Sequence, residues 1–235
     1  MIQTRDNIFE TNSSSTHAVC VHKTATPDDF NKIYHMYAYE SCEFGRCESM
    51  LVESLVGKLA YAYIVAKDLS EWKSNKTGHT LDEFLKNLYE VAEEFYVEPK
   101  DEYDRHHAVS KENIDSIIKQ IDEMEKNYDA YVDHTEDFLD NGFYERIMTD
   151  KDFVKRLIFD EESYITVGGD EYRGYNIKTI GFEDDYEDEF NENYHYQEDE
   201  NGWPIYVDPR DKYIGEFWDK VKEYSKNFEI YFKGN

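Results

Sequence analysis

The spacing of apolar residues predicts helices through the middle of the chain. Between residues 81 and 95 apolar positions recur every three or four residues, and Thr80 with Glu83 forms the S/T-x-x-E signature of a capping box. Behind Ser110, a residue type that caps helices, an isoleucine stripe at 114–124 repeats this spacing. We expect further helices at residues 26–39, 48–67, 136–148, 151–159 and 212–225, with Asp150 as the cap of the helix at 151–159.

Strand patterns lie nearer the two ends of the chain. β-branched and aromatic residues predict strands at 16–22 and 228–232, a hairpin formed by 164–167 and 175–180, and a short strand at 205–207. The predicted fold class is therefore α+β, with a helix-rich middle at about 26–160 and a small antiparallel sheet formed by the N-terminal strand and C-terminal strands. We expect residues 1–235 to form a single domain with an acidic loop or insertion at 183–200.

The charge of the chain changes this picture, because it is large and unevenly distributed. The 53 Asp and Glu residues outnumber 26 Lys and Arg, giving a net charge of −27. Residues 81–141 hold 19 acids and 6 bases, and residues 183–200 hold ten acids and no base, so the rest is close to neutral. Such a chain repels phosphate polymers and anionic membrane surfaces. Direct contact with nucleic acid or with a membrane is therefore not expected.

Closely spaced carboxylates resemble the phosphates of a nucleic acid, and a basic groove binds both. We therefore predict an acidic nucleic-acid mimic that blocks a basic, nucleic-acid-handling protein such as a CRISPR effector or a restriction enzyme. The alternative is an ordinary solvated acidic surface. The predicted partner-binding residues are Glu183, Asp184, Asp185, Glu187, Asp188, Glu189, Glu192, Glu198, Asp199, Glu200, Glu90, Glu93 and Glu94.

Small hydroxyl residues crowd together before the first predicted strand, in the stretch Phe9-Glu10-Thr11-Asn12-Ser13-Ser14-Ser15-Thr16-His17. Serine and threonine satisfy backbone groups in turns, which gives a purely structural interpretation. A hydroxyl near a histidine and a carboxylate is also typical of nucleophilic catalysis. The alternative function is therefore a hydrolase or nuclease-like enzyme, with catalytic candidates Glu10, Ser13, Ser14, Ser15, His17 and His134.

This opening resembles that of uncharacterised proteins from Gram-positive bacteria and their phages, which begin with F-E-T-N-S-S-S-x-H. A weaker likeness continues at Glu43-Phe44-Gly45, at Asp133-His134-Thr135 and from Ser163 to Asp170. The resemblance transfers no activity, but together with the uneven charge it favours a phage or mobile-element origin and a counter-defence role. It also implies a clustered site whose polar members are Glu10, Ser13, Ser14, Ser15, His17, Glu43, Asp133, His134 and Asp170.

The remaining features favour a protein of the bacterial cytoplasm without a cofactor. Three cysteines make an odd count, as in many reduced proteins, and neither a secretory signal nor an apolar run of 18 residues is found. Cys42 and Cys47 have no second cysteine pair, so we expect no metal site. A third hypothesis is a structural or assembly protein of a phage or mobile element that associates through the isoleucine stripe; the oligomeric state stays open.

Overall fold

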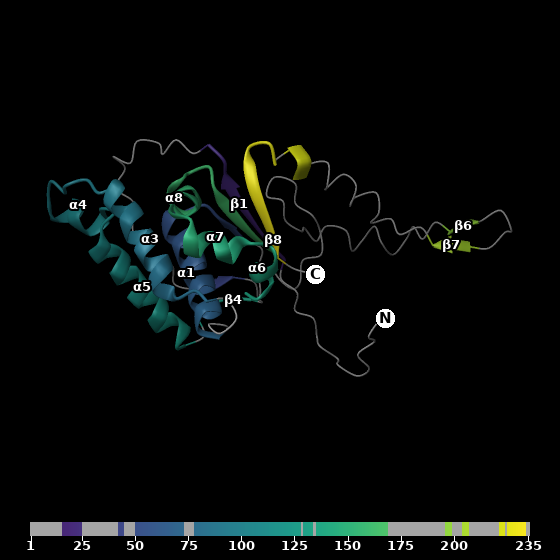
Figure 1. Cartoon of the computed structure of the whole chain (residues 1–235), viewed down its shortest axis with the longest axis horizontal. Coiled ribbons are helices and arrows are strands. Elements are labelled where there is room, and N and C mark those ends of the chain that lie inside the picture. The colour runs from purple at the N-terminus through teal and green to yellow at the C-terminus, as the bar shows by residue number, and fades with distance from the viewer. Residues whose placement is uncertain are drawn as a thin grey trace.

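The computed structural model describes residues 16–24, 42–44, 50–72, 78–127, 129–133, 135–168, 196–198, 204–206, 221–223 and 225–233. Its helices are α1 (Leu55–Trp72), α3 (Leu81–Glu94), α4 (Glu102–His107), α5 (Lys111–Glu125), α6 (Asp137–Asp140), α7 (Phe143–Thr149) and α8 (Lys151–Phe159). Its strands are β1 (Thr16–His22), β2 (Cys42–Phe44), β3 (Met50–Val52), β4 (Ala130–Val132), β5 (Tyr164–Gly168), β6 (Tyr196–Glu198), β7 (Pro204–Tyr206) and β8 (Phe228–Lys233). The predicted α+β class with a helix-rich middle is confirmed (Figure 1).

The main sheet joins strands from distant parts of the chain. Its order is β3-β5-β1-β8, and every pairing is antiparallel, with His17 opposite Val167 on one side and Lys233 on the other. The N-terminal and C-terminal strands are thus neighbours, as predicted. The expected hairpin between 164–167 and 175–180 is wrong for the described strand, because both hydrogen-bonding edges of 165–167 are already occupied by β1 and β3.

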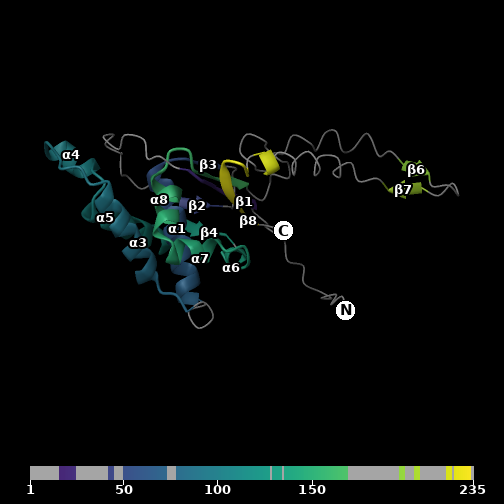
Figure 2. The same ribbon diagram turned by 45° about the horizontal axis from the view of Figure 1, so that its top comes forward.

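The core lies between one face of this sheet and the helices, which gather on one side of it in Figures 1 and 2. Alternation along β1 turns Val19 and Val21 toward the helices and Ala18 and Cys20 toward the other face. The central helix is α1, whose residues 59–66 are all buried. A helix that is apolar on every side is typical of a fully enclosed position. Each fully buried leucine or isoleucine of this kind contributes roughly 1.5–3 kcal/mol.

The predicted caps begin the helices where the sequence places them. The side chain of Thr80 and that of Glu83 form a reciprocal capping box at α3. At α5 the Ser110 hydroxyl accepts a hydrogen bond from the backbone N–H of Asn113 at 3.2 Å, and at α8 the Asp150 carboxylate accepts one from Phe153 at 3.0 Å. These bonds satisfy amide groups that would otherwise lack an intrahelical partner.

Two predicted helices have different boundaries from those expected. The helix expected at 48–67 begins only at Leu55, because Met50–Val52 pairs with β5 and the Ser54 hydroxyl accepts the N–H of Gly57. The helix expected at 136–148 is divided into α6 and α7 by Gly142, whose φ of 81° does not fit a right-handed helix. The helix predicted at 26–39 and the strand at 175–180 lie outside the described residues, as does most of the helix at 212–225.

Two small strand pairs complete the described structure. β2 and β4 are parallel, with Phe44 opposite Val132, and β6 pairs antiparallel with β7, with Glu198 opposite Pro204. Among the described helices, none combines the length and the apolar character that crossing a bilayer requires.

Candidate functional site

The side chain of Tyr61 on α1 is the point where several segments of the predicted cluster meet. Its hydroxyl lies 2.6 Å from Nδ1 of His17 on β1, within hydrogen-bond distance. The ring of Phe44 on β2 contacts the Tyr61 ring edge-on at a centroid distance of 5.1 Å, and Phe138 lies at 6.1 Å. All four side chains are buried. Tyr61 therefore joins β1, β2, α1 and α6 in one aromatic cluster.

The backbone brings two further segments named in the resemblance, at Asp133 and at residues 163–168, to the same region. The N–H of Asp133, directly after β4, donates to the carbonyl of Phe44 at 3.1 Å, which places Asp133 beside the end of β2. Val167 of β5 lies opposite His17. Four segments that are up to 150 residues apart in sequence therefore converge around the β1–α1 contact. Only His17, Glu43 and Asp133 of the nine polar candidates belong to the described residues.

The chemistry of the His17–Tyr61 pair is set by burial. Burial raises the pKa of Tyr61 well above that of a free phenol, so its hydroxyl keeps its proton and acts as a hydrogen-bond group. His17 is only 1% exposed. Within the described residues, the contact between His17 and Tyr61 therefore fixes the orientation of the imidazole and phenol rings in the core. Glu10, Ser13, Ser14, Ser15, His134 and Asp170 lie outside the described residues, so their approach to His17 is untested.

A second polar cluster surrounds Lys58, which the sequence argument did not single out. The ammonium of Lys58 donates to the backbone carbonyls of Asp160 and, at 2.8 Å, Ser163, and the side chain is 1% exposed. Burial lowers the pKa of Lys58 to about 8, although the nearby acids Asp160, Glu161 and Glu53 oppose this shift. The signal in the sequence is a lone lysine inside the apolar run 55–66.

The same cluster ties β1 to the end of α8. The hydroxyl of Ser163 accepts the backbone N–H of His22 at 2.9 Å, and the His22 ring lies 3.4 Å from the Asp160 carboxylate. Lys58 thus caps the carbonyls that follow α8, a position where a positive charge is favourable. We assign this cluster a structural role.

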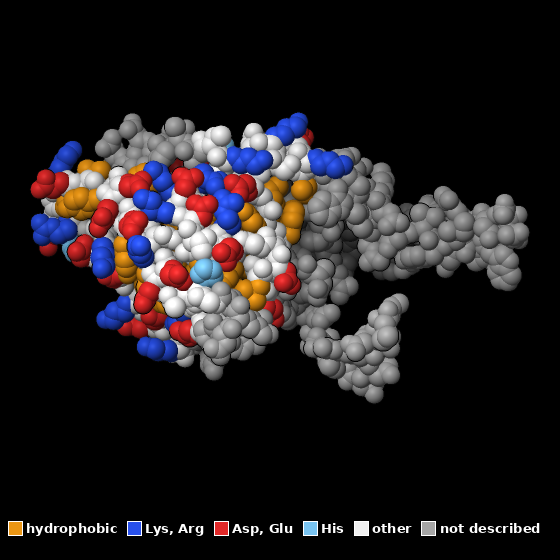
Figure 3. Space-filling model, in the orientation of Figure 1, with side chains coloured by type: hydrophobic (Ala, Val, Ile, Leu, Met, Phe, Trp, Pro, Cys, Tyr) orange, Lys and Arg blue, Asp and Glu red, His pale blue; other side chains and the backbone are white. Residues whose placement is uncertain are grey.

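Two of the three predicted partner-binding acids of α3 form ion pairs with lysines of the same chain. Glu94 forms ion pairs with Lys151 at 3.1 Å and Lys155 at 2.7 Å, and Glu90 lies 3.8 Å from Lys151. Because these lysines belong to α8, much of the charge of Glu90 and Glu94 is balanced within the protein. Figure 3 shows the result, with acidic and basic side chains alternating over this face of the helices. Glu93 is exposed, and no described residue pairs with it.

The acidic segment 183–200 lies almost entirely outside the described residues. Of its predicted contact residues only Glu198 falls in a described element, the backbone of β6, where it pairs with β7. The sequence alone therefore supports a contact role for the other nine acids, which are Glu183, Asp184, Asp185, Glu187, Asp188, Glu189, Glu192, Asp199 and Glu200.

Among the described residues, no group of three or more His, Cys, Asp or Glu side chains is arranged to hold a metal ion. Cys20 and Cys42 are buried, and burial raises the pKa of Cys20 to about 12 despite its hydrogen bond to Tyr164. A thiol with such a pKa stays protonated and is a poor nucleophile. Cys20 therefore acts as a small core residue.

Comparison of the chain with protein-family models, with curated proteins and with solved structures gave no match. Function is therefore inferred from the chemistry of the residues described above.

Proposed function

We propose that this protein is an acidic inhibitor that binds a basic, nucleic-acid-handling protein of the bacterial cytoplasm and blocks its nucleic-acid groove. A CRISPR effector or a restriction enzyme is the expected class of partner. The observation that carries the proposal is the uneven charge: residues 183–200 contain ten acids and no base. A local field of one sign steers a basic partner and competes with phosphate for its arginines and lysines.

Ion pairing within the protein makes the contribution of α3 smaller than that of the acidic segment. Glu90 and Glu94 form ion pairs with lysines of α8, whereas residues 183–200 contain no Lys or Arg. We therefore assign the main contact to 183–200 and a supporting role to exposed carboxylates such as Glu93. The proposal requires the protein to act by binding, without catalysis.

The test compares two variants of the acidic segment. In the first, all ten acids of 183–200 are changed to the matching amides; in the second, each Asp becomes Glu and each Glu becomes Asp, which keeps the charge. The immobilised proteins are incubated with a bacterial lysate at low salt and eluted with rising salt. Each captured protein is then purified and tested for displacement by DNA or RNA.

We expect the wild type and the charge-preserving variant to capture a nucleic-acid-binding protein that elutes steeply with salt and that nucleic acid displaces. The amide variant should capture none. Equal capture by the amide variant, or a captured protein that nucleic acid does not displace, would contradict the proposal.

The convergence of segments on Tyr61 favours the enzyme as the second candidate function. A hydrolase would use His17 together with Glu10, a serine of 13–15 and His134. Turnover of a nitrophenyl ester or a nitrophenyl phosphodiester by the wild type, lost in His17→Gln and in Glu10→Gln, would support it. If the wild type turns over neither substrate class, the buried His17–Tyr61 pair is structural only.

The assembly hypothesis stays a prediction, but most of the isoleucine stripe that it invoked is not on the surface. Ile114, Ile117 and Ile121 of the α5 stripe are 0% exposed and belong to the core of the chain itself. A side chain packed inside its own fold is not available to a second subunit.

A further inference from the structure

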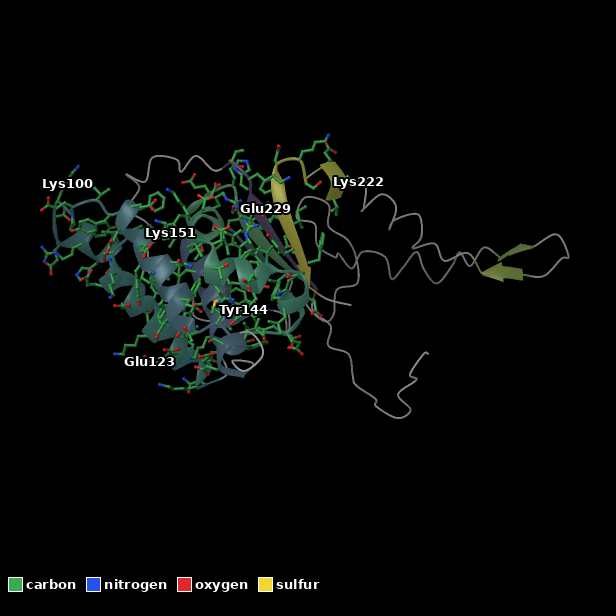
Figure 4. The ribbon with its side chains drawn as sticks, in the orientation of Figure 1. Lys100, Glu123, Tyr144, Lys151, Lys222 and Glu229 are labelled. Atoms are coloured by element: carbon green, nitrogen blue, oxygen red, sulfur yellow. The ribbon has the colours of Figure 1, made fainter. Side chains whose placement is uncertain are left out.

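Three of the four exposed large hydrophobic side chains in the described part of the chain lie within eight consecutive positions. Tyr96, Val97 and Tyr103 are 52%, 48% and 57% exposed, and the fourth, Leu51, belongs to β3. The three residues follow the end of α3 and enter α4. Figure 4 marks this end of the molecule with Lys100, far from Lys222. Exposed apolar side chains that are gathered in one short stretch, rather than scattered singly, are typical of a binding site.

Carboxylates lie close to these side chains in the sequence. Glu98, Asp101 and Glu102 of the same stretch are exposed, and so is Glu93 one turn earlier. Glu93, Glu98 and Glu102 have no ion-pair partner among the residues that the structure describes, in contrast to Glu90 and Glu94. We name residues 96–103 with Glu93 the aromatic–acidic tip.

The tip is held in place by the elements on either side of it. Before it, the ring of Phe95 stacks on Phe159 at a centroid distance of 5.1 Å, with the Lys155 ammonium 5.2 Å from the Phe95 ring. After it, the side-chain amide of Asn113 donates to the carbonyls of Arg105 at 2.9 Å and Ala108 at 2.8 Å, which fixes α4 against α5. A surface anchored at both ends loses little freedom when it binds.

A surface that combines tyrosine rings with carboxylates binds arginine better than any other side chain. The guanidinium of arginine is planar, stacks on aromatic rings and forms paired hydrogen bonds with a carboxylate, whereas the ammonium of lysine is a compact, strongly hydrated charge. We infer that the aromatic–acidic tip docks an arginine-rich segment of the partner protein. This inference depends on the proposed function and adds a second contact surface to it, with a stated preference for arginine.

The experiment measures binding of fluorescently labelled deca-arginine and deca-lysine to the full chain by anisotropy. Tyr96→Ser with Tyr103→Ser removes the two rings and leaves the net charge unchanged. Leu51→Ser removes an equally exposed apolar side chain elsewhere and is the matched control. A variant with Glu98→Gln and Glu102→Gln tests the carboxylates.

We expect the wild type to bind deca-arginine more tightly than deca-lysine. The double tyrosine variant should bind deca-arginine about five- to thirty-fold more weakly, since each exposed cation–π contact contributes about 0.5–1 kcal/mol, and should lose the preference for arginine. The double glutamate variant should weaken binding of both peptides, and Leu51→Ser neither.

Equal binding of the two peptides by the wild type, or an unchanged preference in the double tyrosine variant, would overturn the inference. Neither outcome affects the proposed function, which is decided by the amide variant of 183–200 and by competition with nucleic acid. Loss of that competition with the arginine preference intact would overturn the proposed function and leave the tip as a separate peptide-binding surface.

Discussion

Replacing Glu229 by alanine is expected to loosen the edge strand β8 from helices α7 and α8. The two carboxylate oxygens of Glu229 bind different arginines: Arg156 at 2.9 Å and Arg146 at 3.1 Å. The Tyr231 hydroxyl donates to the same carboxylate at 3.1 Å. Both guanidinium groups also lie over the ring of Phe153, at 4.7 Å for Arg146 and 5.7 Å for Arg156. Glu229 is therefore the anion that β8 supplies to a cationic, aromatic surface.

Exposure sets the size of the expected effect. Arg156 is 10% exposed and Glu229 25%, so this pair lies between a buried pair, whose disruption costs about 3–5 kcal/mol, and a surface pair worth about 0–1 kcal/mol. Arg146 is 34% exposed and adds less. We expect Glu229→Ala to lower the free energy of unfolding by about 2–3 kcal/mol. Glu229→Gln, which keeps the shape and one acceptor, should cost about half as much.

Equilibrium unfolding in urea, followed by circular dichroism, measures this change, and hydrogen exchange of the β8 amides detects local detachment of the strand. Glu123→Ala is the matched control, because Glu123 pairs with Lys119 at 3.9 Å between two exposed side chains. It should leave both measurements unchanged. Figure 4 shows both positions, Glu229 on β8 and Glu123 on α5. A loss below about 0.5 kcal/mol for Glu229→Ala, with unchanged exchange in β8, would refute the reasoning.

Three further changes test single contacts. Partial burial lowers the pKa of His79, but its hydrogen bonds to Glu145 and Glu83 outweigh this effect and raise it. The stabilisation from the ion pairs of protonated His79 with Glu83 and Glu145 should be complete below the ordinary histidine pKa of about 6.5. It should be lost as the pH rises through the higher pKa that His79 has in the folded protein. The melting temperature measured against pH should show this step in the wild type and not in His79→Gln. Tyr61→Phe should cost about 1–2 kcal/mol in urea unfolding by removing the buried hydrogen bond between the Tyr61 hydroxyl and His17, and a neutral result would show that this bond contributes nothing. Ser110→Ala should cost about 1 kcal/mol in the same assay through loss of the α5 cap, whereas Ser110→Asp should not.

The helices with both a cap and an apolar stripe were predictable from local sequence alone. The capping box at Thr80 and the Ser110 cap each satisfy amides within three residues, so no distant part of the chain is needed to define the start of the helix. The strands β1 and β8 were also predictable from their β-branched and aromatic content. Met50–Val52 was not, because three residues hold too little pattern and the pairing with β5 decides their conformation.

The candidate sites also combine features that the local sequence predicts with features that only tertiary contacts decide. The sequence identified His17 and the acidic residues of α3 as unusual, yet it could not reveal that His17 contacts Tyr61 or that Lys151 and Lys155 balance Glu90 and Glu94. Nor could it separate Tyr96 and Tyr103 from the other tyrosines, because exposure is a property of the packed molecule. Lys58 was detectable only as a lysine inside an apolar run.

The sequence by itself determined the α+β class, the caps of α3, α5 and α8, and the concentration of negative charge in two segments. These properties depend on composition and on interactions within a few residues. Only the tertiary structure decided which strands are neighbours, which carboxylates are paired and which aromatic side chains face solvent. Such contacts join residues that are distant along the chain, and they depend on how the helices and the sheet pack, which no local pattern encodes.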